Sequence, residues 1–409
     1  MTGLGVVSPL GNGEEQVFRN AYAGRSGVRR LRDPFASRLA TPLAATVQCD
    51  GSAHFEPAKL RMLDRFSQFA LVAANQAMAD ARLAAPSEVG TVALAEGGVF
   101  VGTGMGGSNT SDDGYRTLYC EGSDRIKPFT ILMGMHNAAA AWIGIDHGFR
   151  GPNLTYSTAC SSSAVAIGEA WLRVASGALD VAIAGGAEAP LSCGSMKAWE
   201  ALHTLATIDT DDPSTSCKPF CKGRSGMVLG EGAAFVVLEP WEHAIARGAT
   251  VRGEILGYGL SNDASHITRP SVDGQVAAIR AALRAACLAP SAVDAINAHG
   301  TGTQANDKTE TAAIKAVFGE HAACIPISAT KAIHGHLLGA AGALECVLSL
   351  LAMQHAVALP TMHLLATDDE CDLDYVPNAA RDDVPVRTML SHSFAFGGTN
   401  AVLVLGAPP

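Results

Sequence analysis

The feature that most constrains the fold is a unit that occurs twice: a short β-favouring strand, a tight corner and a helix rich in small residues. The first copy is Thr155–Arg173 and the second is Ile327–Leu351. Strands and helices that alternate at this length predict right-handed βαβ units and mostly parallel sheets. The repeat also favours an internal duplication, with one half at residues 1–249 and the other at 250–409.

Hydrophobic periodicity predicts the elements around these units. The polar segment 208–230, which contains Asp209 and Asp211, is predicted as a long surface excursion, and Arg29, Arg30 and Arg32 as a solvated face. Strands are predicted over 180–186, 232–238, 252–260, 295–299 and 326–330, and helices over 14–23, 62–83, 241–247, 274–286 and 337–353.

Composition limits the class of protein. The chain has 409 residues, 48% hydrophobic and 17% charged, with 43 glycines, which favours closely packed elements and a large core. The net charge of −10 argues against a general nucleic-acid or membrane-surface binder. Ten cysteines without a signal peptide favour reduced thiols and a cytoplasmic location. Residues 1–11 are typical of the end of a strand and the turn after it, so most of the first strand is expected to be missing before Met1, through a late start codon or a trimmed edge.

Cys160 lies at the corner of the first repeated unit, in the sequence Thr158-Ala159-Cys160, just before an apolar helix that starts at Ser161. Unpaired N–H groups and the positive end of a helix dipole predict a lowered thiol pKa at such a position. The same geometry supplies an N–H that can face an oxyanion. The alternative is a buried structural cysteine.

Three later segments place polar groups at the ends of apolar strands: 297–303 with His299, 328–345 with Lys331 and His336, and 391–400. Burying such groups costs several kcal/mol unless they are paired, although a single histidine at a strand end is usually structural. The groups suit acyl transfer to a thiolate, followed by decarboxylation that generates a carbon nucleophile. Two neutral imidazoles are expected to donate N–H groups to the developing oxyanion, and the Lys331 cation is expected to keep them neutral.

Two other patterns point away from cofactors. Gly102, Gly104 and Gly107 match the dinucleotide-binding fingerprint, but the polar sequence after them predicts no helix to receive a pyrophosphate. Cys217 and Cys221 have no second ligand pair at zinc spacing, so no metal site is predicted.

The motifs STACSSS around Cys160, NAHGTGTQANDKTE around His299, SATKAIHGHLLGAAGALE around Lys331 and the C-terminal SFAFGGTN together resemble one family. The chain resembles the β-ketoacyl-[acyl-carrier-protein] synthases, especially the elongating type II (KAS II-like) enzymes, over nearly its whole length. The resemblance implies an α/β thiolase fold, with two duplicated halves in a five-layered αβαβα sandwich.

The same resemblance implies roles for individual residues. Cys160 is the expected acyl-accepting nucleophile, and His299 and His336 complete a Cys-His-His set. Lys331 is expected to pair with Glu345, and this ion pair requires the chain near Lys331 to bend off the helix axis. Phe396 is expected to act as the gate of the acyl pocket, and its N–H is expected to form the oxyanion hole together with the Cys160 N–H. The phosphopantetheine arm is expected to contact Thr268, Thr301 and Thr303, and the acyl pocket to contain Met105, Phe394 and Phe396. Asp263 and His266 are expected to lie on a mobile loop.

The implied partner is an acidic acyl carrier protein, which brings its own 4′-phosphopantetheine, so no resident cofactor is expected. The chain is expected to form a homodimer, or a heterodimer with a related synthase or chain-length-factor subunit. A basic patch is predicted to steer the carrier. Its proposed members are Lys59, Arg61, Arg65, Arg125 and Lys127.

The reaction implied is a decarboxylating Claisen condensation in fatty-acid elongation or in a specialised polyene or polyketide pathway, and both remain open. A coenzyme A thiolase would need a second cysteine near the C-terminus, and a silent chain-length factor would lack the nucleophile. Ala395, where the family often has glycine, and the polar segment Ser108–Asp113 leave the acyl substrate open.

Overall fold

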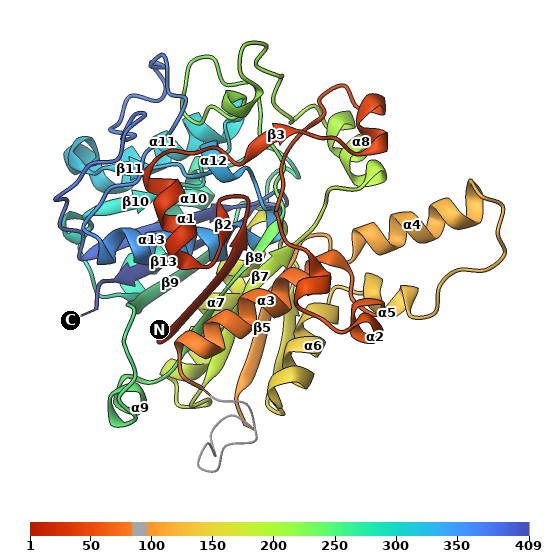
Figure 1. Cartoon of the computed structure of the whole chain (residues 1–409). Coiled ribbons are helices and arrows are strands. Elements are labelled where there is room, and N and C mark those ends of the chain that lie inside the picture. The colour runs from red at the N-terminus through yellow and green to blue at the C-terminus, as the bar shows by residue number, and fades with distance from the viewer. Residues whose placement is uncertain (84–95, 409) are drawn as a thin grey trace.

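A computed structural model describes residues 1–83 and 96–408 of the chain. Two β-sheets form its centre, and helices lie between them and on both outer faces (Figure 1). The sheets divide between strands β8 and β9, so each sheet belongs to one half of the sequence.

The first sheet has the order β2-β1-β8-β7-β5-β6. Strand β1 pairs antiparallel with β8, and β8 antiparallel with β7, whereas β7–β5 and β5–β6 are parallel. The strands are β1 (Gly3–Ser8), β2 (Gly11–Asn12), β5 (Gly98–Gly102), β6 (Asn153–Tyr156), β7 (Ala182–Glu188) and β8 (Gly232–Leu238).

The second sheet has the order β11-β10-β12-β13-β9. Its β9–β13 and β13–β12 pairs are antiparallel, and its β12–β10 and β10–β11 pairs are parallel. The strands are β9 (Glu254–Asn262), β10 (Ala295–Asn297), β11 (Ile327–Ser328), β12 (Thr388–Phe394) and β13 (Thr399–Gly406). A separate hairpin joins β3 (Val28–Arg30) and β4 (Leu43–Ala45).

The two sheets repeat one topology. If the five main strands of each half are numbered along the chain, both sheets read first, fifth, fourth, second, third, with the same parallel and antiparallel pairs. This is the arrangement expected of a duplicated unit. The prediction of mostly parallel sheets is wrong, because half of these pairs are antiparallel: the last strand of each half turns back beside its predecessor.

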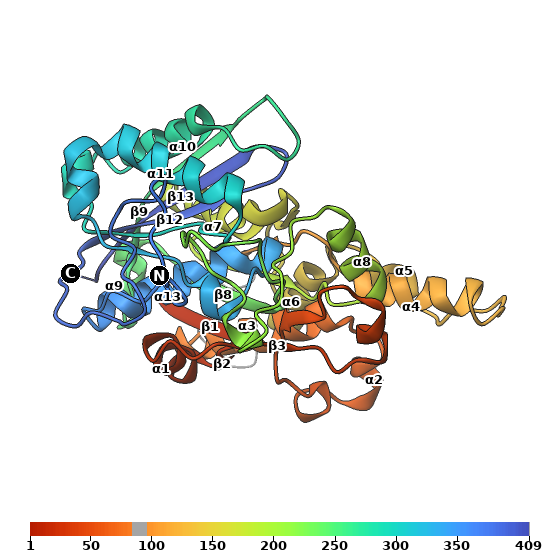
Figure 2. The ribbon, with the colours of Figure 1, turned by 90° about the horizontal axis from the view of Figure 1, so that it is seen from above.

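Helices complete five layers (Figures 1 and 2). Helices α3 (Arg65–Asp80) and α6 (Ala138–His147) cover the outer face of the first sheet, and α10 (Val272–Ala285) and α11 (Gln304–Phe318) lie over the second. Helices α7 (Ser162–Ala175) and α13 (Ala341–Gln354) pack between the sheets, where small residues allow a close approach. A Cβ on Gly342 would lie 2.9 Å from the Ala164 Cβ. The αβαβα sandwich expected from the family resemblance is therefore observed.

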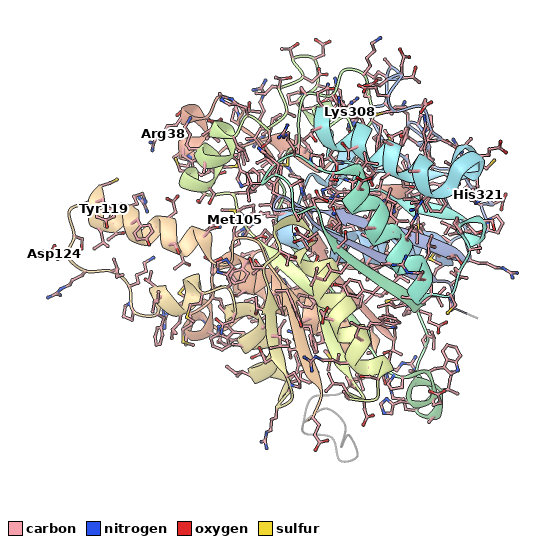
Figure 3. The ribbon with its side chains drawn as sticks, turned by 180° about the vertical axis from the view of Figure 1, so that it is seen from behind. Arg38, Met105, Tyr119, Asp124, Lys308 and His321 are labelled. Carbon is pink, nitrogen blue, oxygen red and sulfur yellow. The ribbon has the colours of Figure 1, made fainter. Side chains whose placement is uncertain are left out.

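The shorter helices lie around this core. Helices α4 and α5 project from the body as an arm, on which Tyr119 and Asp124 lie far from the centre (Figure 3). Among residues 1–83 and 96–408, no helix is both long and apolar enough to cross a membrane. The shorter helices are α1 (Glu14–Tyr22), α2 (Pro57–Leu60), α4 (Ser108–Tyr119), α5 (Thr130–Gly134), α8 (Cys193–Ala201), α9 (Trp241–Ala246) and α12 (Lys331–His334).

Two local predictions need correction. A helix, α4, does follow the glycine-rich loop, although none was expected in so polar a sequence. The segment 208–230 is not simply a surface excursion: Phe220, Met227 and Leu229 are buried, and the chain there lies beside His336. Its polar first part stays at the surface, whereas its later apolar residues fill the space between the halves.

Candidate active site

Cys160 lies on a 3₁₀ turn, Ala159–Ser161, that leads from β6 into α7. Ala159 has a φ of 51°, a region that residues with a Cβ rarely adopt, and this reverses the chain at the end of the strand. The Cys160 side chain is buried, with 5% of the residue exposed. The corner predicted from the sequence is therefore present, although the α-helix proper begins at Ser162.

Burial decides the protonation state of this sulfur. It raises the pKa of the Cys160 thiol to about 12, against the opposing effects of the Lys331 cation and a hydrogen bond from the Phe396 backbone N–H. The sequence-based expectation of a lowered pKa is therefore wrong for the resting protein, because the loss of hydration outweighs the helix terminus. The Phe396 N–H nevertheless donates a hydrogen bond to the sulfur. It is therefore close enough to reach the oxyanion of a carbonyl group that becomes bonded to that sulfur.

His299 follows β10 and is fixed by Lys331. The Lys331 Nζ lies 2.5 Å from the His299 carbonyl oxygen and 3.3 Å from its Nδ1, and it also bonds to Glu345. An ammonium has three N–H bonds, and these are its three acceptors. His299 Nδ1 is then an acceptor, so the proton of the neutral ring is on Nε2. Burial, and then Lys331, lower the pKa of His299 well below its usual value.

His336 has the same tautomer for a different reason. Its Nδ1 accepts a hydrogen bond of 3.2 Å from the Leu338 backbone N–H, which leaves the proton on Nε2. Burial, and then Lys331, also lower the pKa of His336 well below its usual value. The His336 backbone N–H donates to the Val228 carbonyl at 2.7 Å, so the buried segment around Met227 holds this residue. The predicted direction is confirmed for both imidazoles, but the larger cause is burial, and the expected effect of the Lys331 cation comes second.

The three groups converge. One atom each of Cys160, His299 and His336 lie within 4.8 Å of one another, and the two imidazole centroids are 5.4 Å apart at an interplanar angle of 80°. His336 Nε2 is buried and has no hydrogen-bond partner among the described residues. In these tautomers both Nε2 atoms carry a proton. Each ring therefore offers an N–H donor at Nε2, and not a free nitrogen lone pair that could bind a metal.

Lys331 and Glu345 form the expected ion pair, fully buried. Their fourteen-residue separation is bridged because α12 ends at His334 and α13 begins only at Ala341, so the chain turns between them. Burial raises the pKa of the Glu345 carboxyl to about 7, although the Lys331 ammonium opposes this.

A cavity of about 280 Å³ opens at the three groups. Phe396 borders it and stacks on Trp199, with centroids 6.1 Å apart. Thr301 and Thr303 share a hydrogen bond of 2.9 Å at its wall. Of the sequence-predicted residues, the cavity is lined by Cys160, Asp263, His266, Thr268, His299, Thr301, Thr303, His336, Phe394 and Phe396.

One residue predicted for the acyl pocket lies outside this cavity, and two cavity residues belong to the predicted mobile loop. Met105 does not line this cavity; it packs in the apolar cluster beside Cys160, at the base of the arm (Figure 3). Asp263 is tied to Ser271 and Asn400 by hydrogen bonds of 3.1 and 2.7 Å, whereas His266 is exposed. The mobility expected of this loop remains a prediction.

Sequence reasoning missed several residues at the site. Trp199, Met227 and the buried Glu188 belong to segments without a recognisable polar motif, and only the folded chain brings them to Cys160. Glu188 ends an apolar strand, and this is the same sequence signal that indicates His299.

The glycine-rich loop after β5 is held by contacts within the chain. A Cβ on Gly102 would lie 2.2 Å from the Ser163 backbone nitrogen, so this glycine permits close packing of β5 on α7. The N–H groups of Gly104 and Met105 donate to Glu188 instead, at 2.6 and 3.0 Å. The exclusion of a dinucleotide site thus has a different reason from the one expected, since a helix does follow.

Two of the five residues predicted to form the basic patch are paired within the chain. Lys59 bonds to Asp146 at 2.6 Å, and Arg65 bonds to Glu231 at 2.8 Å, so both charges are compensated. Arg61 is exposed just after α2, and Arg125 and Lys127 are exposed between α4 and α5, on the projecting arm. The role of these three residues in steering a carrier remains a prediction.

Known proteins resemble this chain along its full length. Residues 1–244 match the family model "Beta-ketoacyl synthase, N-terminal domain", and residues 252–365 match "Beta-ketoacyl synthase, C-terminal domain". The 3-oxoacyl-[acyl-carrier-protein] synthase 2 of Coxiella burnetii is 43% identical over 416 residues, which cover 99% of this chain and 97% of the relative.

Solved structures agree with this similarity. The ishigamide ketosynthase/chain length factor has a TM-score of 0.91 at 35% identity, covering 100% of this chain and 98% of that one. A type II polyketide ketosynthase in complex with its acyl-carrier protein, AntDE:AntF, has a TM-score of 0.90 at 32% identity, with coverage of 100% and 98%. The duplicated sheets, the buried Cys-His-His cluster and these matches lead to one conclusion: the chain belongs to the beta-ketoacyl synthase family.

Proposed function

We propose that this protein catalyses the decarboxylating Claisen condensation of a Cys160-bound acyl group with a malonyl-acyl-carrier protein, which yields a β-ketoacyl-carrier protein. The observation that carries the proposal is the convergence of one sulfur and two imidazoles, both fixed as neutral Nε2–H donors, at one cavity. Acyl transfer needs the sulfur, and decarboxylation of a thioester needs the donors.

The first half-reaction loads the enzyme. The Cys160 sulfur attacks the thioester carbonyl of an acyl-carrier protein; its proton passes to the departing pantetheine sulfur, and the acyl–Cys160 thioester forms. The high pKa of the free thiol implies that this proton leaves only as the attack proceeds. The N–H groups of Cys160 and Phe396 are suited to hold the oxyanion of the tetrahedral intermediate, since the Phe396 N–H already faces the sulfur.

The second half-reaction makes the carbon–carbon bond. Loss of CO₂ from the malonyl thioester leaves its electron pair as an enolate, whose negative oxygen accepts from the Nε2–H groups of His299 and His336. The enolate carbon then attacks the acyl–Cys160 carbonyl, the sulfur leaves with the bonding electrons, and the resulting thiolate takes up one proton from water to restore the thiol. Because both rings are neutral in the resting protein, they stabilise the enolate without first losing a proton.

The substrates are proposed to arrive on carrier-bound 4′-phosphopantetheine, and no resident cofactor or metal is proposed. The paired hydroxyls of Thr301 and Thr303, with Thr268 across the cavity, are suited to the amides of that arm. Phe394 and Phe396 would contact the acyl group, and a swing of Phe396 away from Trp199 would admit it.

The carrier protein is proposed to dock on an arginine-rich hollow of about 1130 Å³. Arg29, Arg30, Arg32 and Arg38 line it, are exposed, and form no ion pair with a described carboxylate. Of the four acidic residues that line the hollow, Glu231 and Asp113 are paired with Arg65 and Arg116, and Asp33 and Asp112 have no ion pair within residues 1–83 and 96–408, so free positive charge remains in excess. Arg38 lies beside α8, the helix that also carries Trp199 (Figure 3). Such a surface attracts an acidic partner although the whole chain carries a charge of −10.

The protein is proposed to work as a dimer, either with a second copy or as the active subunit beside a chain-length factor. Strand β6 is an edge of the first sheet, with Leu154 exposed on it, and the neighbouring arm exposes Phe129, Ile131 and Leu132. An edge strand next to apolar side chains favours pairing. The ishigamide assembly, a ketosynthase with a chain length factor, is the reason to keep the heterodimer as the second candidate.

Three alanine variants test the chemistry. Cys160→Ala should take up no acyl group from any acyl-carrier protein, as measured by intact mass, but should retain decarboxylation of a malonyl-carrier protein. His299→Ala and His336→Ala should each lower decarboxylation by ~10²–10³. Unchanged decarboxylation in both histidine variants, or no acyl adduct on the wild-type protein from any carrier, contradicts the proposal. A panel of acyl chains would also show whether the pathway is fatty-acid elongation or polyene or polyketide synthesis.

A further inference from the structure

The second half of the chain contains a copy of the corner that carries the nucleophile. Helices α7 and α13 both have 14 residues, and each follows a three-residue 3₁₀ turn, Ala159–Ser161 and Leu338–Ala340. In this register Ala159 matches Leu338, and both have a positive φ, 51° and 46°. Cys160 therefore matches Gly339, so the fold builds the same helix terminus twice and places a sulfur at only one of them.

A carboxylate occupies the second terminus. Glu188, the last residue of β7, accepts a hydrogen bond of 3.0 Å from the Gly339 N–H and one of 2.6 Å from the Gly104 N–H, both at Oε2. Its Oε1 accepts from the Met105 N–H at 3.0 Å and from the Thr103 hydroxyl at 3.2 Å. Glu188 has no exposed surface, and burial raises its pKa to about 7 although these donors lower it.

This carboxylate joins two parts of the candidate active site that are far apart in the sequence. On one side is the loop after β5, whose Met105 packs in the apolar cluster that contains Cys160. On the other side is the turn after His336, where the N–H of Leu338 fixes the His336 tautomer and the next N–H, that of Gly339, bonds to Glu188. A displacement of Glu188 would thus disturb both the apolar cluster around Cys160 and the turn that holds the His336 donor.

We propose that Glu188 is a positioning residue that sets acyl-chain preference through Met105 and holds the His336 turn through Gly339. The inference rests on the proposed condensation and adds to it a determinant outside the main cavity. Glu188 touches no reacting atom; it acts because four donors require an acceptor at both of its oxygens.

The substitution Glu188→Gln separates the two contacts. A glutamine has one acceptor oxygen and one NH₂ donor. Its oxygen is expected to stay with the Gly104 and Gly339 N–H groups, because an NH₂ there would face two donors. The NH₂ then faces Thr103, whose hydroxyl can accept, and Met105, whose N–H cannot. The variant should therefore release Met105 and keep the His336 turn in place.

Two rates are measured on the purified full-length protein: acylation of Cys160 by a short-chain and a long-chain acyl-carrier protein, and decarboxylation of malonyl-carrier protein. In Glu188→Gln the Met105 N–H loses its acceptor, so Met105 should shift and the short-to-long acylation ratio should change, with decarboxylation close to wild type. Glu188→Ala should change the ratio and also lower decarboxylation. The control is Glu239→Gln, a buried carboxylate bonded to Arg247 and Thr2, which should alter neither rate.

An unchanged acylation ratio in a folded Glu188→Gln protein overturns the inference. A parallel loss of both rates together with thermal stability also overturns it, since that pattern marks general structural damage. If neither Glu188 variant folds, Thr103→Val provides the test: it removes one Glu188 donor and should shift the ratio in the same direction, and no shift would refute the role. Failure of the proposed function looks different, because the wild-type protein would then take up no acyl group.

Discussion

Lys331 allows stability and chemistry to be separated by substitution. Its ammonium is buried and bonds to Glu345, to the His299 carbonyl and to the His299 Nδ1. Lys331→Met removes all three bonds and leaves a buried carboxylate whose second oxygen already has no partner among the described residues. Removing one member of a buried ion pair typically costs roughly 3–5 kcal/mol of folding free energy.

The double variant Lys331→Met/Glu345→Leu replaces both charges by apolar side chains of similar size. Such replacements are often neutral or stabilising, so most of the lost free energy of unfolding should return. Decarboxylation should not return, because His299 Nδ1 still lacks its donor and the ring proton is no longer held on Nε2. We expect a loss of ~10²–10³ in the single and the double variant alike.

Urea and thermal unfolding of wild type, both single variants and the double variant form a double-mutant cycle, and malonyl-carrier decarboxylation is measured on the same preparations. Destabilisation that is additive in the double variant would show that Lys331 and Glu345 do not depend on each other. A double variant that decarboxylates at the wild-type rate would refute the argument that Lys331 fixes the His299 tautomer.

Three further results are expected. Alkylation of Cys160 by iodoacetamide should accelerate about tenfold per pH unit from neutral pH to at least pH ~10, because the pKa of the thiol is about 12 and only the thiolate reacts; a plateau near neutrality would contradict this pKa. Reversing Arg29 and Arg30 to glutamate should lower kcat/KM for acyl-carrier protein but not for a small pantetheine thioester, and should weaken the salt dependence; equal effects on both substrates would exclude the docking surface. Gly102→Ala should destabilise the protein far more than Gly223→Ala, whose Cβ would meet nothing within 4 Å, as thermal unfolding would show; equal melting temperatures would mean that β5 and α7 separate easily.

The sequence determined the parts of this protein that depend on local pattern. The corner before α7, the small-residue helices and the polar groups at strand ends are each encoded within a few residues, so the sequence alone indicates Cys160, His299, Lys331 and His336. The pairing of Glu345 with Lys331 is implied by the family resemblance, and helix geometry adds only that the chain must bend for the two to meet.

The tertiary structure decided what depends on surroundings. The pKa of Cys160 rises rather than falls, because the loss of hydration destabilises the thiolate more than Lys331 and the Phe396 N–H stabilise it. The degree of burial depends on the whole fold and is not visible in the local sequence. The antiparallel strands, the burial of Met227 and the neutralisation of Lys59 and Arg65 likewise arise from segments that meet only in the folded chain. Glu188 is the clearest case: its four donors come from two segments, residues 103–105 in the first half and Gly339 in the second, and no local pattern indicates that these segments meet.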